Sequence, residues 1–361
     1  MENVFEVLGG IHKSPDVAER YFEGFMEAWY SCELQCQKGR ARYIMVVPAA
    51  HRKFMEGVIY GQYPTAEITE IADYSQEYSW RNLEKTYDLY GTEIIVSEED
   101  TYPIKTYLAY EDVLAEEERF IDPHQALIES FTNIEEGEEF WIQMLVRPVH
   151  PDTIKQWAMK GEEVIDKLAG KQAELRPSIL GQLLQSALSL PQDLWRAAFV
   201  GPVEPVEARA RQPLFRFPIV SPADQEKMKG ILTKTARGAF KTKIRVVHIA
   251  PAGRLRKPSY AKAFGAFKQF NTFNLNSFLP DPATRTNKPE YFLREFRRYQ
   301  RKRRLLLNYQ WRDFWGVESG FMMSAEELAT LYHLPVKYIR APAVERAKAG
   351  LGSAPANVPL A

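Results

Sequence analysis

Hydrophobic and polar positions alternate with two periods in the first 80 residues, and the periods predict short strands and helices. Residues 66–71 alternate strictly, which is typical of a half-buried strand. Ser14 followed by Pro15 predicts the start of a helix, because serine caps and proline suits the first turn. The predicted order is a strand at 4–8, a helix at 15–29, strands at 31–37 and 42–47, a helix at 48–63 and a strand at 66–71. This is the βαββαβ order of a ferredoxin-like unit.

The middle of the chain continues as a mixture of strands and helices. An apolar run at 140–147 (FWIQMLVR) predicts a central, buried strand. The other predicted elements are a two-strand unit at 86–109 with Gly91 and an acidic turn at 97–100 as breakers, a helix that starts at Asp122 and Pro123, a helix at 152–170 and a helical segment at 178–190. Residues 201–213 hold three prolines without periodicity and predict a linker or crossing.

The last third restarts the same strand–helix alternation. It predicts strands at 214–220 and 240–250, helices from 221 and at 260–270, an irregular Asn-rich stretch at 271–280 and a long basic helix at 291–315. We therefore predict an α+β fold, in which a ferredoxin-like unit precedes further α/β units packed on antiparallel sheets. The predicted divisions are 1–80, 81–200, a linker at 201–213, 214–340 and a tail at 341–361.

A short helix near the end of the chain has the clearest local signature. Ser324 and Glu327 have the spacing of a capping box, in which each side chain accepts a hydrogen bond from the other residue's backbone N–H. Such a short helix is marginal alone, so we expect it to dock, and the tail suggests that a partner follows. The residues predicted to form this motor-docking helix are Ser324, Glu327, Leu328, Leu331, Tyr332 and Pro335.

Composition favours an ordinary folded protein. Hydrophobic residues make up 45%, charged residues 26%, and the formal net charge is zero, so affinity for nucleic acid would need a local patch. No apolar run approaches the roughly 20 residues that a membrane span needs, and the N-terminus lacks a signal-peptide pattern. We predict a cytoplasmic protein, with peripheral attachment to the inner face of the membrane as an alternative.

The motifs of common catalytic sites are missing. The sequence has neither the GxxxxGK[ST] loop that cradles phosphates nor a GxSxG nucleophile elbow. Cys32 and Cys36 have no nearby histidine pair to complete a zinc site, and we interpret them as small side chains on a strand. The six histidines are scattered along the chain. We predict a protein that is not an enzyme and has no cofactor or metal.

The strongest charge feature is the basic run at 294–304 (REFRRYQRKRR). Helical spacing places Arg294, Arg297, Arg298 and Arg301 on one face. One hypothesis is contact with nucleic-acid phosphates. The other is a solvated face that pairs with the chain's own carboxylates or with a protein partner. The candidate contact residues are Arg294, Arg297, Arg298, Arg301, Lys302, Arg303 and Arg304.

Several stretches together resemble one family, the non-ATPase region that precedes the motor ATPase of type IV secretion and conjugative-transfer systems. They are 58–74 (VIYGQYPTAEITEIADY), 121–127 (IDPHQAL), 138–148 (EEFWIQMLVRP), 264–278 (FGAFKQFNTFNLNSF), 301–307 (RKRRLLL) and 323–335. The resemblance implies an accessory scaffold domain that docks or orients a hexameric motor ATPase. The motor ATPase is therefore the expected partner, DNA is the alternative, and oligomerisation stays open. The resemblance implies no catalytic residues.

Overall fold

The computed structural model describes the chain in nine stretches of residues. They are 1–11, 27–110, 123–132, 134–170, 221–255, 261, 264–286, 292–315 and 320–334. The predicted helix at 15–29, the segments at 178–190 and 214–220, the linker at 201–213 and the tail at 341–361 lie wholly or largely outside these residues.

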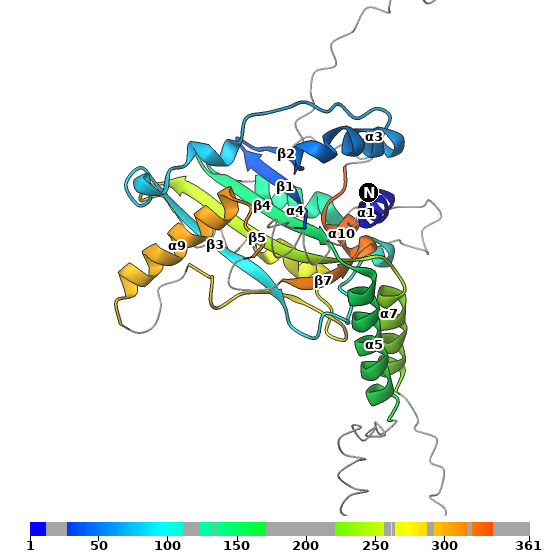
Figure 1. Ribbon diagram of the computed structural model, residues 1–361. Helices are drawn as coiled ribbons and strands as arrows, with labels where there is room; N and C mark the ends of the chain where they lie inside the picture. Colours follow the sequence, from blue (N-terminus) through cyan, green and yellow to red (C-terminus); the bar gives the residue numbers. More distant parts are fainter. Residues whose placement is uncertain are drawn as a thin grey trace, which may run out of the picture. The chain divides into compact units, whose positions relative to one another are not determined.

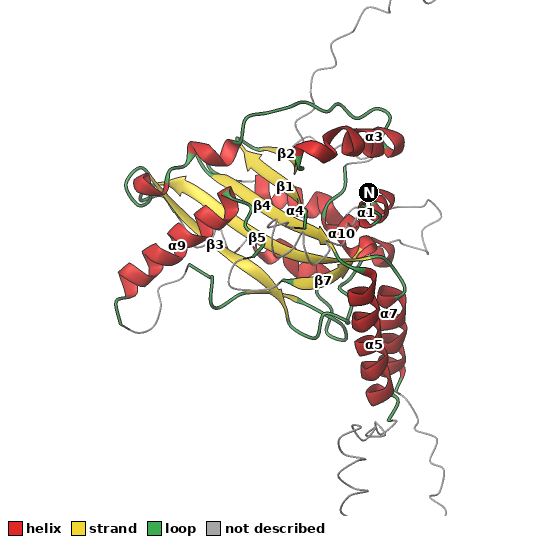
Figure 2. Cartoon of the chain, in the orientation of Figure 1, coloured by secondary structure: helices red, strands yellow, loops and turns green. Residues whose placement is uncertain are grey.

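One antiparallel sheet contains strands from the whole length of the described chain (Figure 2), and their order in the sheet differs from their order in the sequence. Its strands are β1 (Tyr30–Gln37), β2 (Arg40–Val46), β3 (Tyr87–Val96), β4 (Glu139–Pro148), β5 (Ala239–Pro251), β6 (Phe278–Pro280) and β7 (Phe321–Ser324). The strand order in the sheet is β2-β1-β4-β5-β3-β6. Strand β7 pairs with the first residues of β5, along the same edge of β5 that pairs with β3 further along the strand. Strands from all three predicted units thus share one sheet, while the predicted boundaries stay a prediction.

Helices lie on both faces of this sheet. The helices of the described stretches are α1 (Glu2–Gly9), α3 (Arg52–Gln62), α4 (Pro123–Thr132), α5 (Pro151–Leu168), α7 (Pro222–Thr235), α9 (Arg294–Gln310) and α10 (Ala325–Leu331). Helices α1, α4 and α10 contribute apolar side chains to the larger core, whereas α9 lies on the opposite face (Figure 1). The chain divides into two compact units, residues 1–161 with 229–361, and residues 162–228. The sheet belongs entirely to the first unit.

The alternation of side chains in β1 explains why the two faces differ. Cys32, Leu34 and Cys36 point into the larger core, while Glu33 and Gln35 point to the face that α9 covers. Because both faces are covered, all of these side chains are buried. The β1–β2 turn follows from Lys38 and Gly39, whose positive φ angles of 51° and 71° suit a two-residue hairpin.

Most of the predicted strands and helices are confirmed, but three strand predictions are wrong. Residues 4–8 lie in helix α1, where Val4, Phe5 and Leu8 form one buried stripe of helical period. Residues 66–71 have no regular secondary structure, and Ile68 and Ile71 are exposed. The ferredoxin-like unit, which needs strands at both places, is therefore not confirmed, whereas the α+β class is.

The third error concerns Gly91, which was predicted to break the two-strand unit together with the acidic turn at 97–100; β3 does end just before that turn. However, β3 passes through Gly91, and residues 97–106 form no second strand. A Cβ at Gly91 would lie 2.5 Å from the carbonyl oxygen of Val246 and 2.6 Å from Leu305 of α9. Glycine is thus required by the close approach of the helix rather than by a turn.

Candidate functional site

Helix α9 is fixed to the sheet along one side by apolar contacts. Leu305, Leu306 and Tyr309 are buried against Trp141 of β4 and Val247 of β5. Burial of such side chains contributes roughly 1.5–3 kcal/mol each. This side of the predicted basic helix is therefore part of the core.

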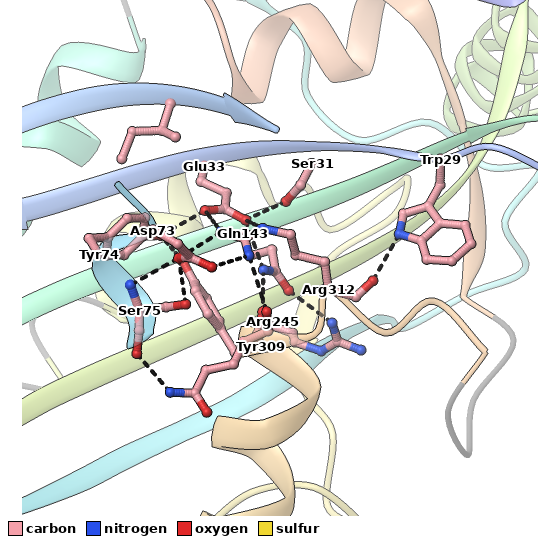
Figure 3. A network of polar contacts seen from close by, with 12 residues as sticks. Trp29, Ser31, Glu33, Asp73, Tyr74, Ser75, Gln143, Arg245, Tyr309 and Arg312 are labelled. Carbon is pink, nitrogen blue, oxygen red and sulfur yellow. Dashed lines mark hydrogen bonds and ion pairs between the residues drawn. The ribbon is translucent and has the colours of Figure 1, made fainter. Parts of the chain in front are cut away.

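A row of four polar residues crosses the sheet beneath the C-terminal end of α9, and Figure 3 labels three of them, Glu33, Gln143 and Arg245. Glu33, Gln143, Arg245 and Glu93 lie directly opposite one another on neighbouring strands β1, β4, β5 and β3. Gln143 Nε2 donates to Glu33 at 3.0 Å, and Arg245 donates to Gln143 at 2.9 Å and to Glu93 at 2.8 Å. Each buried charge therefore has a partner, as low-dielectric surroundings require.

The same polar row caps the C-terminus of α9. Arg245 donates to the carbonyl oxygens of Asn308 and Asp313, and Gln143 donates to that of Tyr309. A helix leaves its last four carbonyls without intrahelical partners, and its C-terminal dipole favours a cation. The row therefore fixes where α9 ends.

Arg312 closes the network just after α9. Its backbone has a φ of 51°, and its side chain donates to Glu33 at 2.9 Å and to Asp73 at 2.7 Å. Burial raises the pKa of Asp73, but hydrogen bonds from Arg312 and Ser75 outweigh it and hold that pKa at about 2. Tyr74 also donates to Glu33 at 2.9 Å. Because Glu33 is fully buried, this network stabilises the fold rather than forming an open site.

Three of the seven predicted contact residues on α9 serve the fold. Lys302 is buried and bonds Glu84 at 2.7 Å and Asp88, while Arg298 pairs with Glu84 at 3.3 Å. Arg303 stacks on the ring of Trp80, 4.2 Å from its centroid. The hypothesis of pairing with the chain's own carboxylates is thus confirmed for Arg298 and Lys302.

The prediction that Arg294, Arg297, Arg298 and Arg301 share one face of the helix is wrong in part, because of this internal pairing. Arg298 faces Glu84, whereas Arg297, Arg301 and Arg304 line a separate groove of about 230 Å³. Arg294, Arg297 and Arg304 are exposed. Besides Glu295 on its own helix, Arg298 pairs with Glu84, which lies 214 residues away in the sequence, so helical spacing alone could not separate the two faces.

Apolar side chains are exposed beside these arginines at the start of α9. Phe292 is 90% exposed, Leu293 71% and Phe296 60%, and Phe296 also lines the groove. Sequence reasoning missed Phe292 and Leu293 as candidate contact residues. Their signal was present, because two large apolar residues directly precede a strongly basic helix.

The predicted docking helix, α10, packs inside the chain's own fold. The Ser324–Glu327 capping box is present, with the Glu327 carboxylate accepting from the Ser324 N–H at 2.9 Å. Leu328, Leu331 and Tyr332 are buried in the larger core. Glu327 also accepts from the Ile104 N–H and pairs with Lys234 at 3.1 Å. These side chains are not a surface open to a motor, which corrects that prediction; Pro335 lies outside the described residues.

Other chemical groups give no second candidate. Cys32 and Cys36 are free and buried on β1, and burial raises the pKa of both thiols. Among the described residues, no group of three or more His, Cys, Asp or Glu side chains could hold a metal ion. Of the helices in the described stretches, none combines the length and apolar character needed to cross a bilayer.

Comparison with protein-family models gives a match over most of the chain. A family model described as a domain of unknown function (DUF8128) matches residues 27–347. No curated protein and no solved structure matches the sequence significantly.

Proposed function

The chain belongs to the DUF8128 family. We propose that it is a non-enzymatic accessory domain that docks or orients a motor ATPase in a type IV secretion-like apparatus, as the resemblance of its sequence stretches implies. The observation that carries the proposal is the two-sided construction of α9. One side is anchored by Leu305, Leu306 and a buried polar network, while Phe296 on the helix and Phe292 just before it are exposed.

A rigidly held helix with an apolar outer end suits a protein partner. Anchoring removes much of the conformational entropy that binding would otherwise cost. Neighbouring exposed aromatic side chains are typical of interaction sites, whereas single exposed apolar residues are common everywhere. We therefore name Phe292, Leu293 and Phe296 together with Arg297 and Arg304 the α9 contact face.

Capture of a type IV secretion-type motor ATPase from the same organism tests the proposal. The double variant Phe292→Ser/Phe296→Ser should weaken capture at least about tenfold. Two phenylalanine side chains that the partner buries on binding contribute more than about 1.4 kcal/mol to the binding free energy. Phe273→Ser is the matched control, because Phe273 is fully exposed outside α9. Capture that the double variant leaves unchanged, while circular dichroism shows a folded protein, would contradict the proposal.

DNA binding through α9 is the second candidate. The exposure of Arg294, Arg297 and Arg304 favours it, since phosphate contact needs accessible arginines. The internal use of Arg298 and Lys302 and the zero net charge weaken it. For these reasons we rank it below the protein partner.

Anisotropy of labelled DNA at about 50 and about 200 mM salt separates the two candidates. Under the DNA hypothesis, Arg297→Glu/Arg304→Glu should abolish binding, whereas Arg40→Glu/Lys53→Glu, with the same charge change on exposed β2 and α3 residues, should not. Absence of binding at both salt concentrations ends this candidate.

A further inference from the structure

We propose that the groove beside α9 binds an acidic peptide segment that carries one large apolar side chain, supplied by the protein partner. This inference rests on the proposed function and names the chemistry of the partner at that site. Three features of the groove support it: its positive charge, its size and the spacing of its arginines.

The first ground is an excess of positive charge at the groove. Arg297 and Arg304 have no side-chain partner among the described residues, and Arg301 is bound only to the carbonyl oxygen of Arg285. Glu93 also lines the groove, but its carboxylate already pairs with buried Arg245 at 2.8 Å. Three arginines therefore line the groove together with one carboxylate that is already neutralised, and guanidinium pairs best with carboxylates in bidentate geometry.

The second ground is the size and lining of the groove. Its apolar lining residues are Phe296 and Leu305 from α9 and Ala283 from another part of the chain. Its volume of about 230 Å³ lies below the roughly 300–1,000 Å³ of sites that enclose a drug-sized molecule. The groove thus fits one large side chain of a peptide better than a whole nucleotide or cofactor.

The third ground is the spacing of the arginines. Arg297 and Arg304 are seven residues apart, so their Cα atoms lie about 10 Å apart along the helix axis. In an extended peptide, residues i and i+4 point to the same side and lie about 13 Å apart. Two glutamates at these positions reach the two arginines with their flexible side chains. An apolar residue at i+2 then enters the groove.

Fluorescence anisotropy with a labelled peptide Gly-Ser-Glu-Ser-Phe-Ser-Glu-Ser-Gly tests the inference on the full chain. We expect saturable binding. It should weaken at least about tenfold when both peptide glutamates become glutamine, or when the phenylalanine becomes serine. Equal binding of the glutamine peptide, or no binding of the original peptide, would overturn the inference.

Two variants of the chain test the groove itself. Arg297→Gln/Arg304→Gln removes the charge, and Ala283→Trp fills the space from an exposed position without changing charge. Both should abolish peptide binding, while Arg40→Gln/Lys53→Gln should not. Circular dichroism checks that each variant is folded. Peptide binding that survives both groove variants places the peptide elsewhere and overturns the inference.

Competition and capture experiments separate the remaining outcomes. Displacement of the peptide by oligo-dT at equal concentration would show that the groove binds phosphates, and this result would overturn the inference. Motor capture that depends on Phe292 and Phe296 but not on Ala283→Trp or the arginine pair also overturns the inference and leaves the proposed function standing. Peptide binding without motor capture supports the inference and contradicts the motor as partner.

Discussion

His248 is a titratable side chain with no solvent exposure in the longest strand of the sheet. Its ring stacks on Phe140 with centroids 4.2 Å apart, and its Nε2 lies 3.3 Å from the carboxylate of Glu138. Burial lowers the pKa of His248 from its ordinary value of 6.5 to about 4. The folded chain therefore holds this imidazole neutral at pH values where an unfolded chain would protonate it.

This difference predicts acid sensitivity of the fold. Between about pH 6.5 and 4 the unfolded state binds a proton at His248 that the folded state does not bind, so stability falls as the pH falls. The loss should approach about 3 kcal/mol, since each pKa unit corresponds to about 1.4 kcal/mol. His248→Phe should flatten this part of the pH profile in urea unfolding. His150→Phe, at a partly exposed histidine, should not flatten it. A His248→Phe variant with the wild-type pH profile would contradict the assignment.

Gly91 makes a second residue-scale prediction. Gly91→Ala should lower the free energy of unfolding by about 1–3 kcal/mol, because its Cβ would clash with backbone and with Leu305. Gly57→Ala on α3, where a Cβ meets nothing within 4 Å, should instead raise stability by roughly 0.5–1 kcal/mol through helix propensity. Chemical denaturation measures both variants. Equal stability of Gly91→Ala and wild type would show that α9 is not packed tightly on β3.

At the scale of elements, the anchoring of α9 depends on Arg245. Arg245→Met should cost about 3–5 kcal/mol, because Glu93 would remain buried without its cation and the carbonyl oxygens of Asn308 and Asp313 would each lose a hydrogen bond from the guanidinium group. Hydrogen exchange should show faster opening of the last turn of α9. Lys53→Met, at an exposed position of α3, is the control. Unchanged exchange in Arg245→Met would mean that the apolar contacts alone hold this helix.

The elements themselves could largely be predicted, because their signals are local. The capping box at Ser324 and the turn after β1 each depend on residues within a few positions of one another. The strand predictions at 4–8 and 66–71 failed, because a short apolar run does not reveal its period and an alternating run is a strand only when another strand pairs with it.

The candidate site could be predicted only in outline. The basic run on α9 is visible in the sequence, but its inward and outward residues are separated by Glu84 and Asp88, which lie more than 200 residues before Lys302. The polar row beneath α9 depends on the register of four strands, which no single stretch of sequence contains.

At the scale of the whole molecule, the sheet, the polar row and the groove all belong to the unit formed by residues 1–161 and 229–361. Within this unit, a Cβ at Gly161 of α5 would lie 2.9 Å from Thr235 of α7. The two helices are therefore in contact near the points where the chain leaves this unit and returns to it. Neighbouring helices are about 8–10 Å apart, and a flexible linker of about six residues easily spans that distance. We therefore expect this unit to fold without residues 162–228.

Replacement of residues 162–228 by a six-residue Gly/Ser linker tests this expectation. The shortened chain should keep its β-sheet circular dichroism, unfold within a few degrees of the full chain and bind the acidic peptide with unchanged affinity. The same linker in place of residues 321–331 should prevent folding, since β7 and α10 are buried throughout. If the first replacement also unfolds the protein, the sheet depends on the second unit, and α9 is anchored by more of the chain than its own face of the sheet.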